Sequence, residues 1–106
     1  MLITQELRTF EKELIMDGEK PLTLKTVLLR TMVGDMRKPA AKEMSAEDAA
    51  KCFALGVRIA SVESDEIDLE VEDKAFLLKQ LENSYWTALV FGQCKLMLND
   101  KPTGLV

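Results

Sequence analysis

The sequence predicts a mainly α fold: a compact single domain of four to five helices, to which one short β pairing can be added. The chain has 106 residues, the usual length of one domain. Hydrophobic residues make up 47% and charged residues 30%, which is the balance of an ordinary globular protein. Apolar residues recur at helical spacing in several segments. We expect residues 1–98 to form the helical domain and residues 99–106 to form a C-terminal tail.

The first segment fits either a helix or a strand. Four apolar residues follow a 4-3-4 spacing that favours an amphipathic helix, namely Ile3, Leu7, Phe10 and Leu14. Phe10, Leu14 and Met16 would also share one face of an extended strand. We expect a helix over residues 2–12 and a short strand just before the Asp-Gly turn signal at 17–18.

The second segment has both a start and a stop signal. Thr23 is a suitable N-cap, and Gly34 is a suitable left-handed C-cap. The core positions between them are Leu24, Val27, Leu28 and Met32. Residues 35–45 contain Pro39 and read as an exposed loop. That loop carries the sole basic cluster, formed by Arg37, Lys38 and Lys42.

The third segment is the clearest helix, over residues 46–62. Ser45 opens it with acidic residues in the first turn, as in a capping box. Two apolar rows follow: Ala49, Phe53, Val57 and Ala60 form one, and Cys52, Leu55, Ile59 and Val62 form the other. Because these rows cover a wide face, we expect this helix to be the central one, contacted on several sides.

Two further helices are expected in the second half of the chain. Residues 67–69 could form a brief extended segment that pairs with residues 14–16. A helix is predicted over residues 72–82 and a last one over residues 85–98, which is apolar nearly all round. Gly92 lies inside this last helix, where glycine costs about 1 kcal/mol relative to alanine. A close helix neighbour would explain it.

The composition excludes several kinds of chemistry. There is no histidine, so histidine-based catalysis and classical zinc fingers are excluded. Cys52 and Cys94 lie far apart on apolar rows and are interpreted as buried thiols. Glycine-rich phosphate loops are also missing from the sequence. We therefore expect a protein that is not an enzyme and that uses no cofactor and no metal.

Negative charge is concentrated between the third and fourth predicted helices. Seven acidic residues lie between positions 63 and 73 with no base among them. The candidate acidic surface consists of Glu63, Asp65, Glu66, Asp68 and Glu70. The run lacks the glycine and the spacing of an EF-hand, and a solvated loop is the simplest interpretation. It would repel a phosphate backbone, so we expect no direct binding of nucleic acid.

The last predicted helix offers a candidate surface for a protein partner. Tyr85 and Trp86 are adjacent, so on a helix they point in different directions, and both residue types are favoured at interfaces. The candidate partner-binding residues are Tyr85, Trp86, Leu89, Phe91 and Met97. The alternative is that these side chains belong to the core. Their number exceeds what a small core easily absorbs, and we therefore expect a homo-oligomer.

A family resemblance rests on two stretches, DGEKPLTLKTVLLRTM at 17–32 and IDLEVEDKAFLLKQLENSYWTALVFGQCKLML at 67–98. These stretches resemble small acidic helical proteins of tailed bacteriophages and prophages. The resemblance implies the cytoplasm of a bacterial host or association with a virion. No apolar run approaches the length of a membrane span, and the first residues do not read as a secretory signal, so no membrane is expected.

Three functions are compatible with these features. The first is a non-enzymatic interaction protein of a phage or prophage, an assembly factor or minor virion component. The alternative is an acidic inhibitor of a host defence or nucleic-acid-binding machine that mimics a phosphate backbone. The third is a small helical transcriptional regulator. The connection between residues 62 and 71 is too long for the usual helix-turn-helix.

Overall fold

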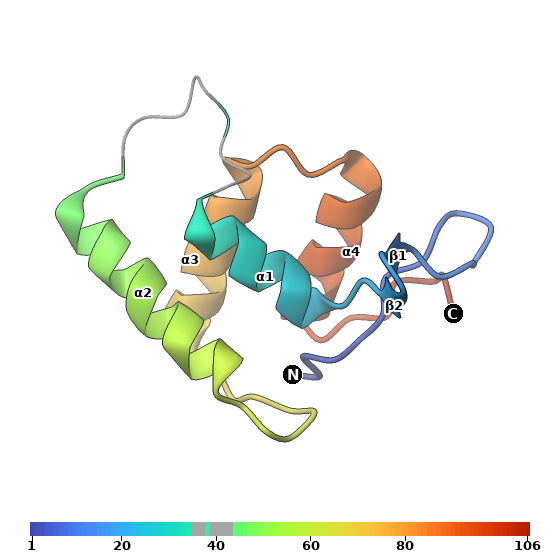
Figure 1. Ribbon diagram of the computed structural model, residues 1–106, viewed down its shortest axis with the longest axis horizontal. Coiled ribbons are helices and arrows are strands. Elements are labelled where there is room, and N and C mark those ends of the chain that lie inside the picture. The colour runs from blue at the N-terminus through green and yellow to red at the C-terminus, as the bar shows by residue number, and fades with distance from the viewer. Residues whose placement is uncertain (35–37, 39–43) are drawn as a thin grey trace.

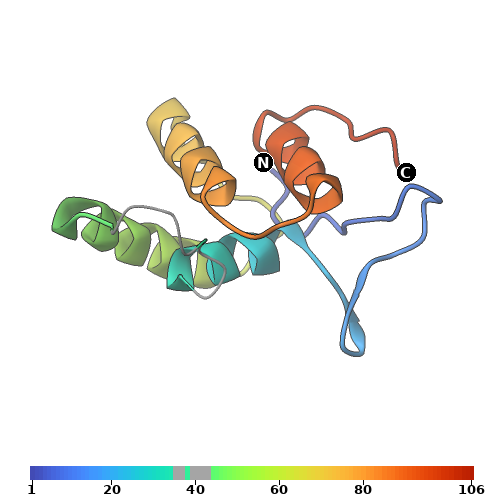
Figure 2. The ribbon, with the colours of Figure 1, turned by 90° about the horizontal axis from the view of Figure 1, so that it is seen from above.

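Four helices and one short hairpin make up the part of the chain that the computed structural model describes, residues 1–34, 38 and 44–106 (Figure 1). The helices are α1 (Leu24–Val33), α2 (Ala46–Ala60), α3 (Val71–Glu82) and α4 (Ala88–Leu98), and the strands are β1 (Met16–Asp17) and β2 (Lys20–Pro21). Seen from above, α1 and α2 form one layer and α3 and α4 form a second (Figure 2). The coarse prediction of a mainly helical domain with a short β pairing is confirmed over these residues.

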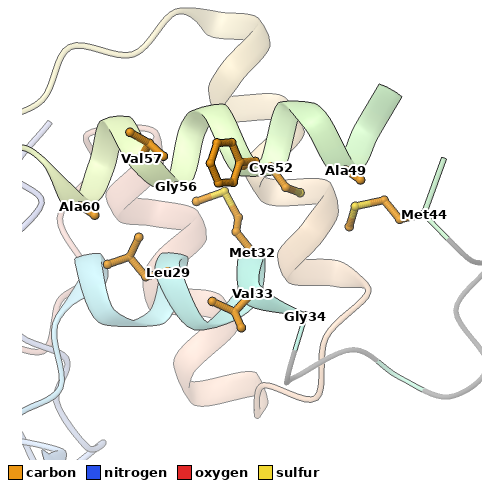
Figure 3. Close-up of a pocket in the computed structure, with 11 residues that line it drawn as sticks. Leu29, Met32, Val33, Gly34, Met44, Ala49, Cys52, Gly56, Val57 and Ala60 are labelled. Carbon is orange, nitrogen blue, oxygen red and sulfur yellow. The ribbon is translucent and has the colours of Figure 1, made fainter. Parts of the chain in front are cut away.

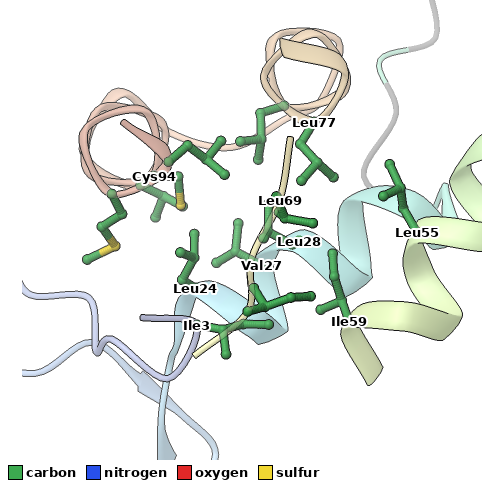
Figure 4. Close-up of a cluster of buried hydrophobic side chains, with 14 of the residues drawn as sticks. Ile3, Leu24, Val27, Leu28, Leu55, Ile59, Leu69, Leu77 and Cys94 are labelled. Carbon is green, nitrogen blue, oxygen red and sulfur yellow. The ribbon is translucent and has the colours of Figure 1, made fainter. Parts of the chain in front are cut away.

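Helix α1 forms where the capping signals predict it. The Thr23 side chain accepts a hydrogen bond from the Thr26 amide at 3.3 Å, which satisfies one of the free donors of the first turn. Gly34 ends the helix with a φ of 97°, a left-handed conformation that glycine adopts without steric cost. Leu24 and Leu28 are fully buried and face the other layer (Figure 4). α1 packs against α2 and also contacts α3, which in turn contacts α4.

The prediction that the helix beginning after Ser45 is the central one is wrong. Ser45 does cap α2, because its hydroxyl accepts from the Asp48 amide at 3.1 Å. Yet α2 lies at the edge of the molecule and packs mainly against α1 (Figures 1 and 2). Of its two apolar rows, only the one with Cys52, Leu55 and Ile59 is buried. The row that contains Phe53 faces outward, because no other described element covers it.

The predicted helix over residues 2–12 is also wrong. This segment consists of isolated β-bridges and turns, and it forms backbone hydrogen bonds with distant parts of the chain. The Ile3 amide donates to the Asp65 carbonyl at 2.8 Å, and the Leu7 amide donates to the Leu22 carbonyl at 2.9 Å. Ile3 and Leu7 are both fully buried, whereas Phe10 is 74% exposed. A spacing of four residues places two side chains on one face of a strand as well as of a helix, so the pattern does not separate the two.

The short β pairing exists, but with partners other than those predicted. Strands β1 and β2 form a two-stranded antiparallel hairpin across Gly18, whose φ is 65°. The segment around residue 67 does not pair with residues 14–16. It pairs with the start of the chain, because the Ile67 amide donates to the Met1 carbonyl at 3.0 Å. The acidic run is thereby connected to the N-terminal segment.

Helices α3 and α4 differ slightly from their predicted ranges. α3 begins one residue early, at Val71, and buries Phe76 and Leu77. α4 begins at Ala88 instead of residue 85, because the Thr87 side chain accepts from the Val90 amide and acts as the N-cap. The expected helix neighbour of Gly92 is not found among the described residues, since a Cβ there would meet nothing within 4 Å.

The C-terminal residues 99–106 follow α4 along the surface. Their Asp100 carboxylate pairs with Lys74 of α3 at 3.2 Å and lies 3.9 Å from the amino group of Met1. The tail thus begins in contact with the domain. No helix in the described ranges is both long enough and apolar enough to cross a bilayer.

Candidate functional site

An apolar groove of about 630 Å³ lies between α1 and α2 (Figure 3). Leu29, Met32 and Val33 form the wall on α1. Phe53 and Val57 line the groove from α2. None of the eleven lining residues carries a charge. The described lining of the groove therefore offers a ligand apolar contact and no charged side chain.

The apolar side chains at the groove are unusually open to solvent. Phe53 is 75% exposed, Val33 is 72% exposed and Val57 is 50% exposed. Single exposed apolar residues are normal on protein surfaces, but a contiguous apolar patch marks a contact surface. These three residues border one groove, so they form such a patch.

Small residues leave the α2 side of the groove open. Ala49, Gly56 and Ala60 lie on the same face of α2 as Phe53. Gly56 has an ordinary helical backbone, and a Cβ added there would meet nothing within 4 Å. A glycine in a helix interior costs about 1 kcal/mol relative to alanine. Internal packing of the described residues therefore gives no reason for Gly56.

The two basic side chains of α2 are directed to α3 and not to the groove. The Lys51 ammonium lies 4.7 Å from the centre of the Phe76 ring on α3, and Arg58 pairs with Asp73 of α3 at 3.6 Å. Both cations thus have partners in the same neighbouring helix. The α2 residues that line the groove are all uncharged.

The five residues of the predicted acidic surface are all exposed. Glu63, Asp65, Glu66, Asp68 and Glu70 lie in the connection between α2 and α3. None of their carboxylates forms an ion pair with a base in the described ranges. No group of three or more potential metal ligands occurs among the residues that the structure describes. The surface is therefore strongly negative and open to solvent.

The five predicted partner-binding residues do not form one exposed surface. Tyr85 is exposed, and Trp86, Leu89 and Phe91 are half-buried. The Trp86 indole donates to the Thr31 hydroxyl at 2.8 Å, which anchors its ring against α1. Met97 is 3% exposed and belongs to the core. The surplus apolar surface expected on the last helix is found on α2 instead.

The buried side chains include the thiols of Cys52 and Cys94 and the amide of Gln93. Cys52 and Cys94 are buried, and burial raises the pKa of the Cys94 thiol to about 12, so it is protonated at neutral pH. Gln93 is buried in α4, and its side-chain amide bonds to both the N–H and the C=O of Arg8. Its only signal in the sequence is a polar residue within an apolar helix.

The predicted basic cluster falls largely outside the described part of the chain. Arg37 and Lys42 lie outside the described residues. Lys38 lies at the end of α3, where its amide donates to the Asn83 carbonyl at 3.1 Å.

No protein family, curated protein or solved structure matches the chain.

Proposed function

We propose that this chain is a non-enzymatic protein–protein interaction protein that binds an apolar helix face in the groove between α1 and α2. The observation that carries the proposal is the exposure of Phe53 and Val57 beside a groove whose described lining residues are all uncharged. In the biological setting that the phage resemblance implies, this binding would serve assembly or attachment to a virion.

A helix is the occupant that the groove shape favours. Two helices side by side present ridges and grooves, and a third helix packs against such a pair at its apolar face. The 15-residue helix α2 is about 22 Å long, which matches four turns of a partner helix. Recognition of an amphipathic helix in an apolar groove is a recurring mode of peptide binding. An extended peptide would instead need an open strand edge.

The test uses a synthetic amphipathic helical peptide with leucines on one face and glutamines and lysines on the other. We expect saturable binding by fluorescence anisotropy, with weak dependence on salt because the described lining residues of the groove are uncharged. The variant Phe53→Lys should abolish binding. Phe10→Lys is a matched control, because Phe10 is equally exposed but lies outside the groove. Equal loss in both variants, or no binding to the wild-type protein, would contradict the proposal.

A second candidate function rests on the acidic surface. Its five carboxylates are exposed and have no ion-pair partner in the described ranges, as mimicry of a phosphate backbone requires. Neutralising Asp65, Glu66, Asp68 and Glu70 together would then abolish competition with duplex DNA for basic DNA-binding proteins. The wild-type effect would fall steeply with salt. If neutralisation leaves competition unchanged, phosphate mimicry is wrong.

A further inference from the structure

We infer that the helix bound in the groove is α2 of a second copy of this chain, packed antiparallel about a twofold axis near its middle. This inference rests on the proposed function of the groove as a docking site. It adds the identity of the occupant and the register of the contact.

The first argument is that one patch holds both the projection and the hollow. A twofold interface uses the same surface on both copies, so that surface must be complementary to itself. Phe53 projects from α2 with 75% of its surface exposed. Gly56 lies one turn further along the same face and has no side chain. The Phe53 ring of each copy can therefore occupy the hollow at Gly56 of the other.

The second argument is the register that this contact sets. In an antiparallel pair, opposing positions have a constant sum of residue numbers. Placing Phe53 opposite Gly56 also places Ala49 opposite Ala60. Both of these residues are small and line the groove, so the helix axes can approach closely at each end of the contact. The pattern of large and small residues thus fits one antiparallel register.

The third argument is electrostatic. The chain has a net charge of −4, and its acidic run follows the C-terminal end of α2. A parallel pair would place the two acidic runs side by side, where like charges repel. An antiparallel pair separates the two runs to opposite ends of the contact, where each lies beside Glu47 and Asp48 at the start of the partner copy's α2. It also aligns the two helix dipoles favourably. The contact itself uses the side of α2 that lines the groove, where no described lining residue is charged.

Sedimentation equilibrium of the full chain from micromolar to millimolar concentration tests the inference. We expect the mass to rise from 11.9 kDa to that of a dimer. Phe53→Lys should raise the dissociation constant by roughly 30-fold or more, the effect of losing an interface hot spot. Phe10→Lys should leave it unchanged. Because Phe53 and Phe10 are both exposed in the folded chain, neither change should unfold it, and circular dichroism checks this.

A cysteine pair tests the register. The double variant Ala49→Cys/Ala60→Cys should form a covalent dimer on mild oxidation. The two positions of one chain are 11 residues apart on a helix, about 16 Å, which is too far for an internal disulfide. The single variant Ala49→Cys should not form the dimer, and the wild-type chain, with Cys52 and Cys94 buried, is a further control. A dimer from Ala49→Cys alone would indicate parallel packing and overturn the inference.

The remaining outcomes separate this inference from the proposed function. A wild-type chain that stays monomeric at every concentration but binds the amphipathic peptide overturns the second copy as occupant and keeps the groove as a docking site. A dimer that survives Phe53→Lys overturns the α2 contact. A dimer that Phe10→Lys also dissociates would indicate that the loop bearing Phe10 occupies the groove, in a head-to-tail contact. That result would overturn the antiparallel pair as well.

Discussion

Replacing Gln93 by leucine is expected to loosen the N-terminal segment from α4. The buried amide of Gln93 donates to the Arg8 carbonyl at 2.8 Å and accepts from the Arg8 amide at 2.9 Å. It also donates to the Leu89 carbonyl at 3.0 Å, one turn earlier in its own helix. The two bonds to Arg8 connect residues 85 positions apart, so they close a long loop of the chain. Leucine preserves the volume and removes all three bonds.

The expected cost follows from these bonds and from the burial of Arg8. Each long-range bond contributes about 1 kcal/mol net, and an unsatisfied buried backbone group costs about 1–3 kcal/mol. Arg8 is only half-buried, so water replaces part of what is lost. We therefore expect Gln93→Leu to lower the free energy of unfolding by about 2 kcal/mol, equivalent to a decrease in Tm of roughly 8–16 °C.

Urea unfolding followed by circular dichroism measures the change, and amide hydrogen exchange locates it. Exchange should accelerate at Arg8 and at Leu7, whose amide bonds to Leu22 in the same segment. Gln5→Leu is the matched control, because Gln5 is half-buried and its amide makes one local bond, to the Leu2 carbonyl at 2.7 Å. If Gln93→Leu costs no more than Gln5→Leu, the reasoning about the buried amide is refuted.

Three further predictions concern α1, α2 and α4. Trp86→Phe removes the bond to the Thr31 hydroxyl and should cost about 1 kcal/mol in urea unfolding, a loss that a double-mutant cycle with Thr31→Val should assign to the pair. Gly56→Ala should stabilise the isolated monomer by about 0.5–1 kcal/mol, measured by thermal unfolding at low concentration, because its Cβ meets nothing; destabilisation would show that the site is already filled. Burial raises the pKa of Cys94 from 9.0 to about 12, so the unfolded chain loses this proton first. Stability should therefore fall as pH rises from about 9 towards 12, with a shallower fall in Cys94→Ala; parallel profiles would contradict this.

The helices that the sequence predicts well are those with local signals. Thr23 and Gly34 bound α1, and Ser45 begins α2, because each acts through hydrogen bonds or backbone conformation within one turn. Such signals depend only on neighbouring residues. The sequence predicts the start of α4 too early, at residue 85. Thr87 is the N-cap, but the apolar residues just before it continue the pattern of the helix.

The N-terminal segment could not be predicted because its partners are remote. Ile3 and Leu7 are four residues apart, a spacing that suits a helix and an alternating strand equally. Their conformation is decided by backbone bonds to Asp65 and Leu22, which no local pattern contains. The bonds of Gln93 to Arg8 belong to the same class of long-range contact.

The groove could not be predicted from the periodicity of apolar residues. Two apolar rows on one helix predict a helix covered on two sides, but not which molecule covers each side. The row with Cys52 is covered by the chain itself, and the row with Phe53 is not. Gly56 lies on the same side of α2 as the uncovered row. Its lack of a side chain is not required by any contact among the described residues. A helix that carries a second apolar row and a glycine with open space around it has the composition of a central helix. Its position at the edge of the fold therefore favours a partner that completes the packing from outside.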